Sequence, residues 1–331
     1  MRIFSGMRPS GQLHIGNYLG ALKNWVELQK KTTPQKDGAG CIFGVVDYHG
    51  ITTPFIPKQI SKDIKELVLD YLAAGIDPKK SIIIIQSHIP EHTELAWILG
   101  TLTPVSWLER IPTYKEKLEL HPKHRNLGLL AYPVLMAADI LIYKANIVPV
   151  GDDQMPHVEI TNDIVKRFNQ IFGKTFPFVK GIINEGMGAR IKSLVDPSKK
   201  MSKTGNEGIA LTDSPDTIRQ KIKTAVTDSG REIKYDEKNK PAISNLLTIY
   251  HLFSNKPIDE IERKYRGKGY AEFKKDLAEV IIKGLKPFQE TRKKYAKNPR
   301  LVEKILAEGE KKAQKIAQQT IKEVKARMGL I

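Results

Sequence analysis

The first half of the chain alternates short apolar runs with stretches whose apolar residues recur every three or four positions. The runs at residues 3–6, 41–47, 81–85 and 147–150 are rich in β-branched residues, which is typical of strands in a parallel sheet. Between and after them, the spacing predicts helices over residues 17–29 and 61–75 and a helix that opens at residues 151–154. The alternation favours an α/β fold with crossover helices.

Cap residues suggest where two of these helices begin and end. Ser61 can cap the helix at 61–75, and Gly75, followed by Pro78, is typical of its end. Pro156 falls just inside the helix that opens after residue 154, where proline is tolerated in the first turn. We therefore expect both helices to form.

Two longer helical regions interrupt and follow the alternation. Residues 92–144 form an insertion-like region with an apolar segment at 127–143. After residue 199 strand signals fade, and a stripe from Val302 to Val324 at three- and four-residue spacing predicts a long terminal helix. The sequence predicts a Rossmann-like catalytic domain over residues 1–197, with a helical insertion at about 92–144, and an all-helical C-terminal domain over 198–331.

Composition narrows the class of protein. The 331 residues are 40% hydrophobic and 27% charged, which fits a soluble globular protein of two domains. A single cysteine, Cys41, excludes an intrachain disulfide and a cysteine-rich metal cluster, and no histidine pair has a spacing that favours zinc. We expect no metal site. With no leader-like start and no apolar run of about 20 residues, we expect a cytoplasmic protein without a membrane partner.

The net charge of +17 is concentrated near the C-terminus. Residues 251–331 hold 21 Lys and Arg against 11 Asp and Glu, a net charge of +10. This quarter is the strongest candidate for a surface that faces a polyanion, although solvated lysine-rich helices explain the charge equally well.

Two short motifs suggest phosphate handling. His14-Ile15-Gly16-Asn17 follows a glycine-rich turn at a helix start, where free backbone amides favour anions and Gly16 allows close approach of a base. Alone, it is more often an ordinary glycine-rich loop. Lys200-Met201-Ser202-Lys203-Thr204 is a basic loop whose lysines can neutralise a leaving pyrophosphate and whose hydroxyls can donate to it. Alone, it also fits a lysine-rich linker.

Together and in this order, the two motifs resemble those of the class I aminoacyl-tRNA synthetases. Within that class, the blocks at residues 11–21, 136–141, 148–154 and 193–197 are similar to the bacterial tryptophanyl-tRNA synthetases. The resemblance covers nearly the whole chain. It departs from the commonest pattern at Asn17, where many members have histidine, at Thr204, where serine is usual, and in a longer loop at 31–40.

The resemblance implies activation of L-tryptophan by ATP with Mg²⁺, followed by transfer to tRNA(Trp), in a homodimer with no tightly bound cofactor. It assigns catalytic roles to His14, Asn17, Lys117, Lys200 and Lys203. It assigns ATP binding to Arg8, Pro9, Ser10, Gly16, Asn17, Gly151, Asp152, Asp153, Ile191, Lys200, Met201, Ser202, Lys203 and Thr204. It assigns tryptophan binding to Phe4, His49, Tyr132, Met136, Asp139, Val148, Val150 and Gln154. The helical insertion would supply much of the dimer contact, and the C-terminal domain would bind the anticodon.

Asp139 has a physical rationale of its own. It lies in the apolar run 135–141, where an unpaired carboxylate is costly to bury. Indole offers one donor and no acceptor, so a buried acceptor selects tryptophan over phenylalanine. The alternative is a helix carboxylate paired with a neighbouring Arg or Lys.

Three other functions compete with this interpretation. A tyrosyl-tRNA synthetase shares the class, but the blocks at 136–139 and 151–154 and the helical C-terminus argue against it. A nucleotidyltransferase that makes a small coenzyme would leave the basic C-terminal third without a purpose. An RNA-binding paralogue without catalysis would not need the intact lysine loop.

Overall fold

The computed structural model describes residues 1–33, 40–183, 186–202 and 207–331. In these residues, five parallel strands form one sheet in the order β3-β2-β1-β4-β5. The strands are β1 (Ile3–Met7), β2 (Cys41–Val45), β3 (Ser81–Ile85), β4 (Ile147–Val150) and β5 (Lys180–Ile183). The first four are the predicted ones. β5 was not predicted because it is a short edge strand, partly exposed, that begins with Lys and Gly.

Helices connect the strands much as the periodicity predicts. A continuous helical segment after β1 comprises α1 (Ile15–Asn17), the π-helical η1 (Tyr18–Leu22) and α2 (Lys23–Lys31). The short α3 (Asp47–Gly50) follows β2 and leads to α4 (Pro57–Ala74). The predicted Ser61 cap is wrong because α4 begins four residues earlier, where Pro57 occupies the first turn and Ser61 lies inside the helix. Its end is as predicted, since Gly75 takes a left-handed φ of 103°.

The predicted insertion between β3 and β4 is helical. It holds the 3₁₀ turn η2 (Gln86–His88), α5 (Glu91–Gly100), α6 (Val105–Glu109), α7 (Pro112–Leu120) and α8 (Leu127–Leu141). After β4, η3 (Asp152–Gln154) leads into α9 (Met155–Phe172), which tolerates its proline in the first turn as predicted. A further 3₁₀ turn, η4 (Met187–Arg190), follows β5.

Both faces of the sheet are covered by apolar side chains. Alternation along the strands sends Ile3 and Phe43 into one buried cluster and Phe4 and Ile42 into another. The first cluster includes residues of α2 and α4 and continues into the C-terminal helices, whereas the second includes residues of α5, α8 and α9. The sheet is therefore buried on both sides, which explains its uninterrupted apolar strands.

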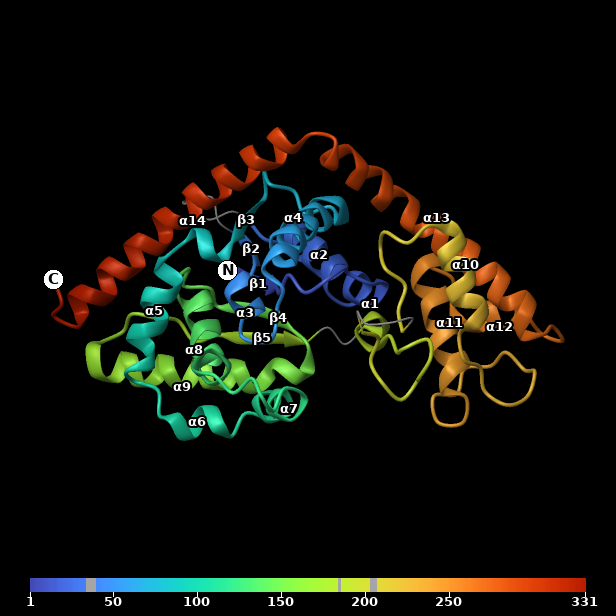
Figure 1. The fold of residues 1–331 in the computed structure, drawn as a ribbon, viewed down its shortest axis with the longest axis horizontal. Coiled ribbons are helices and arrows are strands. Elements are labelled where there is room, and N and C mark those ends of the chain that lie inside the picture. The colour runs from blue at the N-terminus through green and yellow to red at the C-terminus, as the bar shows by residue number, and fades with distance from the viewer. Residues whose placement is uncertain (34–39, 184–185, 203–206) are drawn as a thin grey trace.

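The C-terminal part is helical, as predicted. It contains α10 (Pro215–Thr224), α11 (Pro241–Ser254), α12 (Ile258–Lys264), α13 (Tyr270–Ala296) and α14 (Pro299–Arg327). Figure 1 shows α13 and α14 as an arch that leaves the cluster of α10–α12 and runs back over the sheet. No helix in the described part of the chain is long and apolar enough to cross a bilayer.

Ion pairs and close packing join this arch to the part of the chain that forms the sheet. Nε of Arg292 on α13 donates to Oδ1 of Asp70 on α4 at 2.6 Å, and the same guanidinium also binds Glu66. α14 packs against β3, and a Cβ built on Gly309 would lie 2.3 Å from the carbonyl oxygen of Ile83. Only glycine allows the helix to approach the edge strand this closely. The last helix therefore belongs to the core around the sheet.

Candidate active site

A cavity of about 1330 Å³ opens at the carboxyl ends of the strands. It is lined after β1 by Arg8 and Ser10 and after β4 by Gly151 and Asp152. β1 and β4 are neighbours in the sheet at the point where the strand order reverses direction. In open α/β sheets this switch point leaves a crevice that commonly binds ligands.

The two sequence motifs meet beside this cavity. The backbone N–H of Ile15 donates to the carbonyl of Ile209 at 2.9 Å, and the N–H of Leu211 donates to Leu13 at 2.9 Å. These bonds join the first motif to the segment that follows the lysine loop. His14, Gly16, Asn17, Lys200 and Met201 all line the same cavity, so the motifs face one space.

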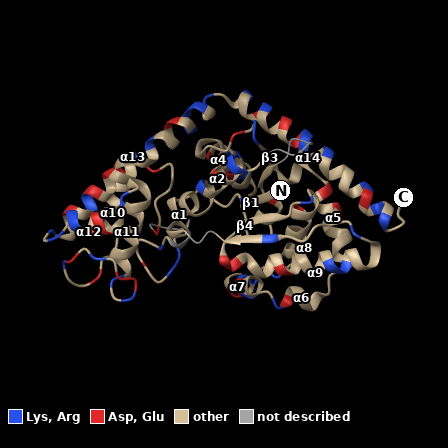
Figure 2. Cartoon of the chain, turned by 180° about the vertical axis from the view of Figure 1, so that it is seen from behind, with Lys and Arg blue, Asp and Glu red and all other residues tan. Residues whose placement is uncertain are grey.

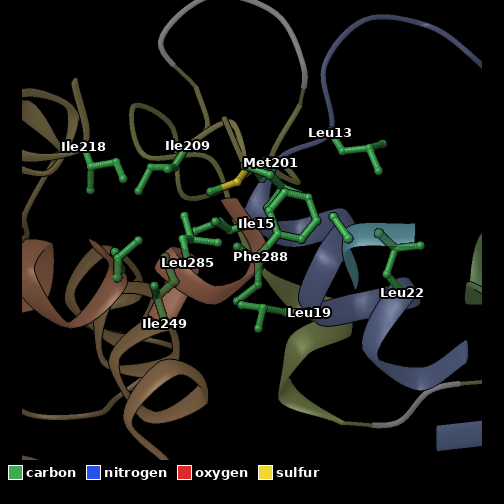
Figure 3. Close-up of a cluster of buried hydrophobic side chains, with 14 of the residues drawn as sticks. Leu13, Ile15, Leu19, Leu22, Met201, Ile209, Ile218, Ile249, Leu285 and Phe288 are labelled. Carbon is green, nitrogen blue, oxygen red and sulfur yellow. The ribbon is translucent and has the colours of Figure 1, made fainter. Parts of the chain in front are cut away.

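The methionine of the lysine loop is anchored in the core. Figure 3 shows the Met201 side chain beside Ile15 and Phe288, which come from α1 and α13. Met201 is only 4% exposed, and its N–H donates to the carbonyl of Ile191 at 3.1 Å. The loop is therefore fixed at its methionine to both the first helix and the C-terminal helices.

Three cations line the cavity, and we name Arg8, Lys117 and Lys200 the cationic wall. Nζ of Lys117 lies 3.8 Å from the centroid of the Tyr132 ring, a cation–π contact. Burial, and secondarily the charge of Arg8, lowers the pKa of Lys117 to about 8. Burial also lowers the pKa of Arg8. Among the described residues, no ion pair joins these cations to a carboxylate, so an anion entering the cavity meets positive charge.

The same cavity is also lined by a buried carboxylate. Asp139 on α8 is 1% exposed, and its oxygens accept hydrogen bonds from Nε2 of His49 at 2.8 Å, Nδ1 of His92 at 2.6 Å and Nε2 of Gln86 at 2.7 Å. We name these four residues the carboxylate cluster. Burial alone raises the pKa of Asp139, but the hydrogen bonds from His49 and His92 lower it below its ordinary value. The partners in the described residues are therefore imidazole and amide groups, not the predicted alternative of Arg or Lys.

Apolar side chains surround this carboxylate. Phe4, Met136, Val148 and Val150 line the cavity beside Asp139. The Phe4 ring stacks on Tyr143, with centroids 5.7 Å apart, which holds it against α8. Apolar walls beside a buried acceptor suit an apolar ligand with one hydrogen-bond donor.

The structure brings most of the predicted site together. Every residue predicted to bind tryptophan lines the cavity, as do the predicted catalytic residues that are described. Most of the predicted ATP-site residues line it too: Arg8, Ser10, Gly16, Asn17, Gly151, Asp152, Asp153, Ile191, Lys200 and Met201.

Four predicted residues are exceptions. Pro9 and Ser202 are not among the lining residues, and the Ser202 hydroxyl donates to Glu207. Lys203 and Thr204 lie outside the described residues. The ligand assigned to each residue stays a prediction.

Sequence reasoning missed four buried or half-buried polar residues near the cavity, namely Gln86, His92, Thr113 and His157. Gln86 and His92 bind Asp139, while the hydroxyls of Thr113 and Tyr132, 2.6 Å apart, both lie within bonding distance of Nε2 of His157. Gln86 could have been found because it directly follows the apolar strand β3, at the carboxyl ends of the strands, where ligands bind. His157 lies three residues after Gln154, in the first turn of the same helix.

Comparisons with known proteins agree with this geometry. A tryptophan–tRNA ligase of Caldanaerobacter subterraneus is 46% identical over 333 aligned residues, which cover 100% of this chain and 98% of that relative. The crystal structure of a tryptophanyl-tRNA synthetase from Mycoplasma pneumoniae matches with a TM-score of 0.87 and 32% identity, over 99% of this chain and 97% of that one. The crystal structure of the Campylobacter jejuni tryptophanyl-tRNA synthetase in complex with ADP and tryptophan matches with a TM-score of 0.83 and 34% identity. The match covers 99% of this chain and 100% of that one.

The family model described as tRNA synthetases class I (W and Y) matches residues 1–286. This span contains the sheet, the insertion, both motifs and most of α13. With its parallel sheet, its two converging motifs and these relatives, the chain belongs to the class I tRNA synthetases of the W and Y family.

Proposed function

We propose that this enzyme activates L-tryptophan with ATP and transfers it to tRNA(Trp), the activity of a tryptophan–tRNA ligase. The observation that carries the proposal is one cavity that is lined both by the cationic wall and by the buried acceptor Asp139 with its apolar neighbours. Full-length similarity to tryptophan–tRNA ligases supports the same activity. The rival tyrosyl and nucleotidyltransferase functions have no comparable support.

In the first step, a carboxylate oxygen of tryptophan attacks the α-phosphorus of ATP, and the bond to pyrophosphate breaks. Negative charge grows on the leaving pyrophosphate, so we assign Arg8, Lys117 and Lys200 to its stabilisation. ATP enters as its magnesium complex, in which the phosphates carry the metal. Among the described residues, no group of three or more His, Cys, Asp or Glu could hold a metal ion by itself.

Asp139 is the proposed selector of the amino acid. Its carboxylate has about four acceptor positions, of which the protein uses three. An indole N–H can take the remaining one, whereas phenylalanine would leave it unpaired in an apolar site. Rejection of a ligand that lacks the required donor is the strong form of specificity.

In the second step, a hydroxyl of the terminal tRNA ribose attacks the tryptophanyl carbonyl, and AMP leaves. We assign anticodon binding to the helices of residues 198–331. Figure 2 shows Lys and Arg along α13 and α14, interspersed with acidic residues, and Lys286, Lys293 and Lys297 of this stretch are exposed. Such a surface can bind an RNA backbone in a salt-dependent manner. The substrates of this reaction fit a cytoplasmic location.

We further propose that the enzyme is a homodimer joined through the insertion. Trp97 on α5 is 78% exposed and Val105 on α6 is 56% exposed. Large apolar side chains this exposed are typical of protein interfaces. Sedimentation of the wild type and of Trp97→Glu tests this, because a dimer through this face should dissociate in the variant, and an unchanged mass would exclude the face.

Pyrophosphate exchange into ATP tests the proposed activity. Exchange should depend on tryptophan and should be near background with tyrosine or phenylalanine. Tyrosine-dependent exchange would overturn the assignment. Charging of tRNA(Trp) with radiolabelled tryptophan then checks the second step.

A further inference from the structure

A hydrogen-bond chain runs behind the Asp139 carboxylate, away from the cavity. Nδ1 of His92 lies 2.6 Å from Asp139, and Nε2 of the same ring lies 2.7 Å from the hydroxyl of Tyr143. Both His92 and Tyr143 are fully buried. Unlike His49 and Asp139, they do not line the cavity, so they do not contact a ligand directly.

The groups along this hydrogen-bond chain define which atom donates each hydrogen bond. The Tyr143 hydroxyl keeps its proton, because burial, and secondarily the charge of Asp139, raises the pKa of this phenol well above its ordinary value. It can therefore donate to Nε2 of His92, which leaves the imidazole proton on Nδ1, facing Asp139. A neutral ring in this tautomer satisfies all three groups.

The chain is also held mechanically. His92 lies in the first turn of α5, Tyr143 follows the end of α8, and α5 packs along α8. The Tyr143 ring lies against His92, with ring centroids 5.3 Å apart, and stacks on Phe4 from the other side. Neither ring can turn without disturbing packed neighbours.

We propose that His92, held in one tautomer by Tyr143, is a positioning residue that fixes the orientation of the Asp139 carboxylate and thereby sets selectivity for the indole N–H. Gln86 and His92 both donate to Oδ1, while His49 donates to Oδ2. Donors to both oxygens fix the plane of the carboxylate, and with it the direction of the acceptor position left for the ligand. The inference rests on the proposed function, because it requires Asp139 to receive the indole.

The test compares two substrates that differ at one atom. Tryptophan and benzothienylalanine, in which sulfur replaces the indole N–H, are measured by pyrophosphate exchange with wild-type enzyme and with His92→Leu. The variant should lose at least about tenfold of the preference in kcat/KM for tryptophan over the sulfur analogue, because a charge-assisted hydrogen bond is misdirected. A merely structural role would lower both substrates equally and leave their ratio unchanged.

Two further variants keep the test decisive if His92→Leu folds poorly. His92→Asn retains a donor near the position of Nδ1 and should restore most of the preference. Tyr143→Phe retains all three bonds to Asp139 but removes the donor that sets the tautomer, so it should lower the preference less than His92→Leu. The inference is wrong if a soluble His92→Leu keeps the full preference or, where His92→Leu does not fold, if Tyr143→Phe keeps it.

A matched control and the wild type separate this inference from the proposed function. His88→Leu removes a half-exposed histidine of the same connection that binds Glu310 instead, and it should keep the wild-type ratio. A wild-type enzyme that uses the sulfur analogue as well as tryptophan would refute the role of Asp139 itself. A wild type that discriminates, together with His92 variants that discriminate equally, would refute only the role of His92.

Discussion

The carboxylate cluster and the cationic wall, two regions that line the same cavity, have opposite electrostatic requirements. At the carboxylate cluster, a buried negative charge is compensated by three donors from the protein before any ligand arrives. At the cationic wall, the charge of Arg8 acts on Lys117, and both groups have lowered pKa values. A site that must discriminate is rigid and hydrogen-bonded, whereas a site that must receive a polyanion retains uncompensated positive charge.

The difference between the two regions also follows from the helices, strands and loops that carry their residues. The carboxylate cluster is supported by α8, α5 and the turns after β2 and β3, all packed in the core. Lys200 belongs to an exposed loop segment that is anchored at Met201. Changes in the carboxylate cluster should therefore alter which amino acid reacts, and changes in the cationic wall should alter how fast ATP reacts.

Removing the buried carboxylate should have the largest effect. In Asp139→Ala, kcat/KM for tryptophan should fall by about 10³-fold, because three donors and the indole lose their acceptor. The KM for ATP should change little, and the preference over phenylalanine should collapse. Pyrophosphate exchange with tryptophan and with phenylalanine measures these constants. Equal losses in the kinetic constants for ATP and for tryptophan would contradict separate roles for the carboxylate cluster and the cationic wall.

Removing a cation of the cationic wall should have the next largest effect. Lys200→Ala should slow adenylate formation by about 10²-fold while barely changing tryptophan affinity, because its charge acts on the leaving pyrophosphate. Single-turnover kinetics and tryptophan titration measure the two quantities. Lys199→Ala is the control, since this neighbouring lysine pairs with Asp196 and does not line the cavity.

The lowered pKa of Lys117 predicts that kcat/KM for ATP depends moderately on pH. Its charge is present below about pH 8 and is lost as pH rises through its pKa of about 8, so kcat/KM for ATP should fall about tenfold per pH unit above that value. Lys117→Met should remove this limb of the profile. Lys115→Met, on the exposed face of α7, should retain it, and a limb that survives in Lys117→Met would assign the titration to another group.

A change remote from both the carboxylate cluster and the cationic wall should have the smallest effect on activity. Gly309→Ala places a methyl group against the Ile83 carbonyl and should lower the free energy of unfolding by about 1–3 kcal/mol. Exchange at a temperature where the variant is folded should be unchanged. Gly100→Ala is the control, because its added methyl meets nothing within 4 Å. Thermal denaturation compares the two, and altered amino-acid preference in Gly309→Ala would show that α14 influences the site.

Prediction from the sequence succeeded where the signal was local. β1 to β4 are apolar runs, and the sheet buries them as expected. It was wrong at the start of α4, where proline rather than Ser61 sets the boundary, and it missed β5, whose edge position weakens the apolar signal. Asp139 was assigned through the family resemblance and is conspicuous as an acid in an apolar run, but no local pattern identified its hydrogen-bond partners.

The sequence by itself determined the strand and helix pattern and the two motifs, since each depends on residues close along the chain, and the family resemblance singled out Asp139. Only the tertiary structure decided what holds that acid. His49, Gln86 and His92 lie 90, 53 and 47 positions from Asp139. Helical and strand periodicity describes one element at a time, whereas a hydrogen bond between elements depends on how the sheet and the insertion pack together.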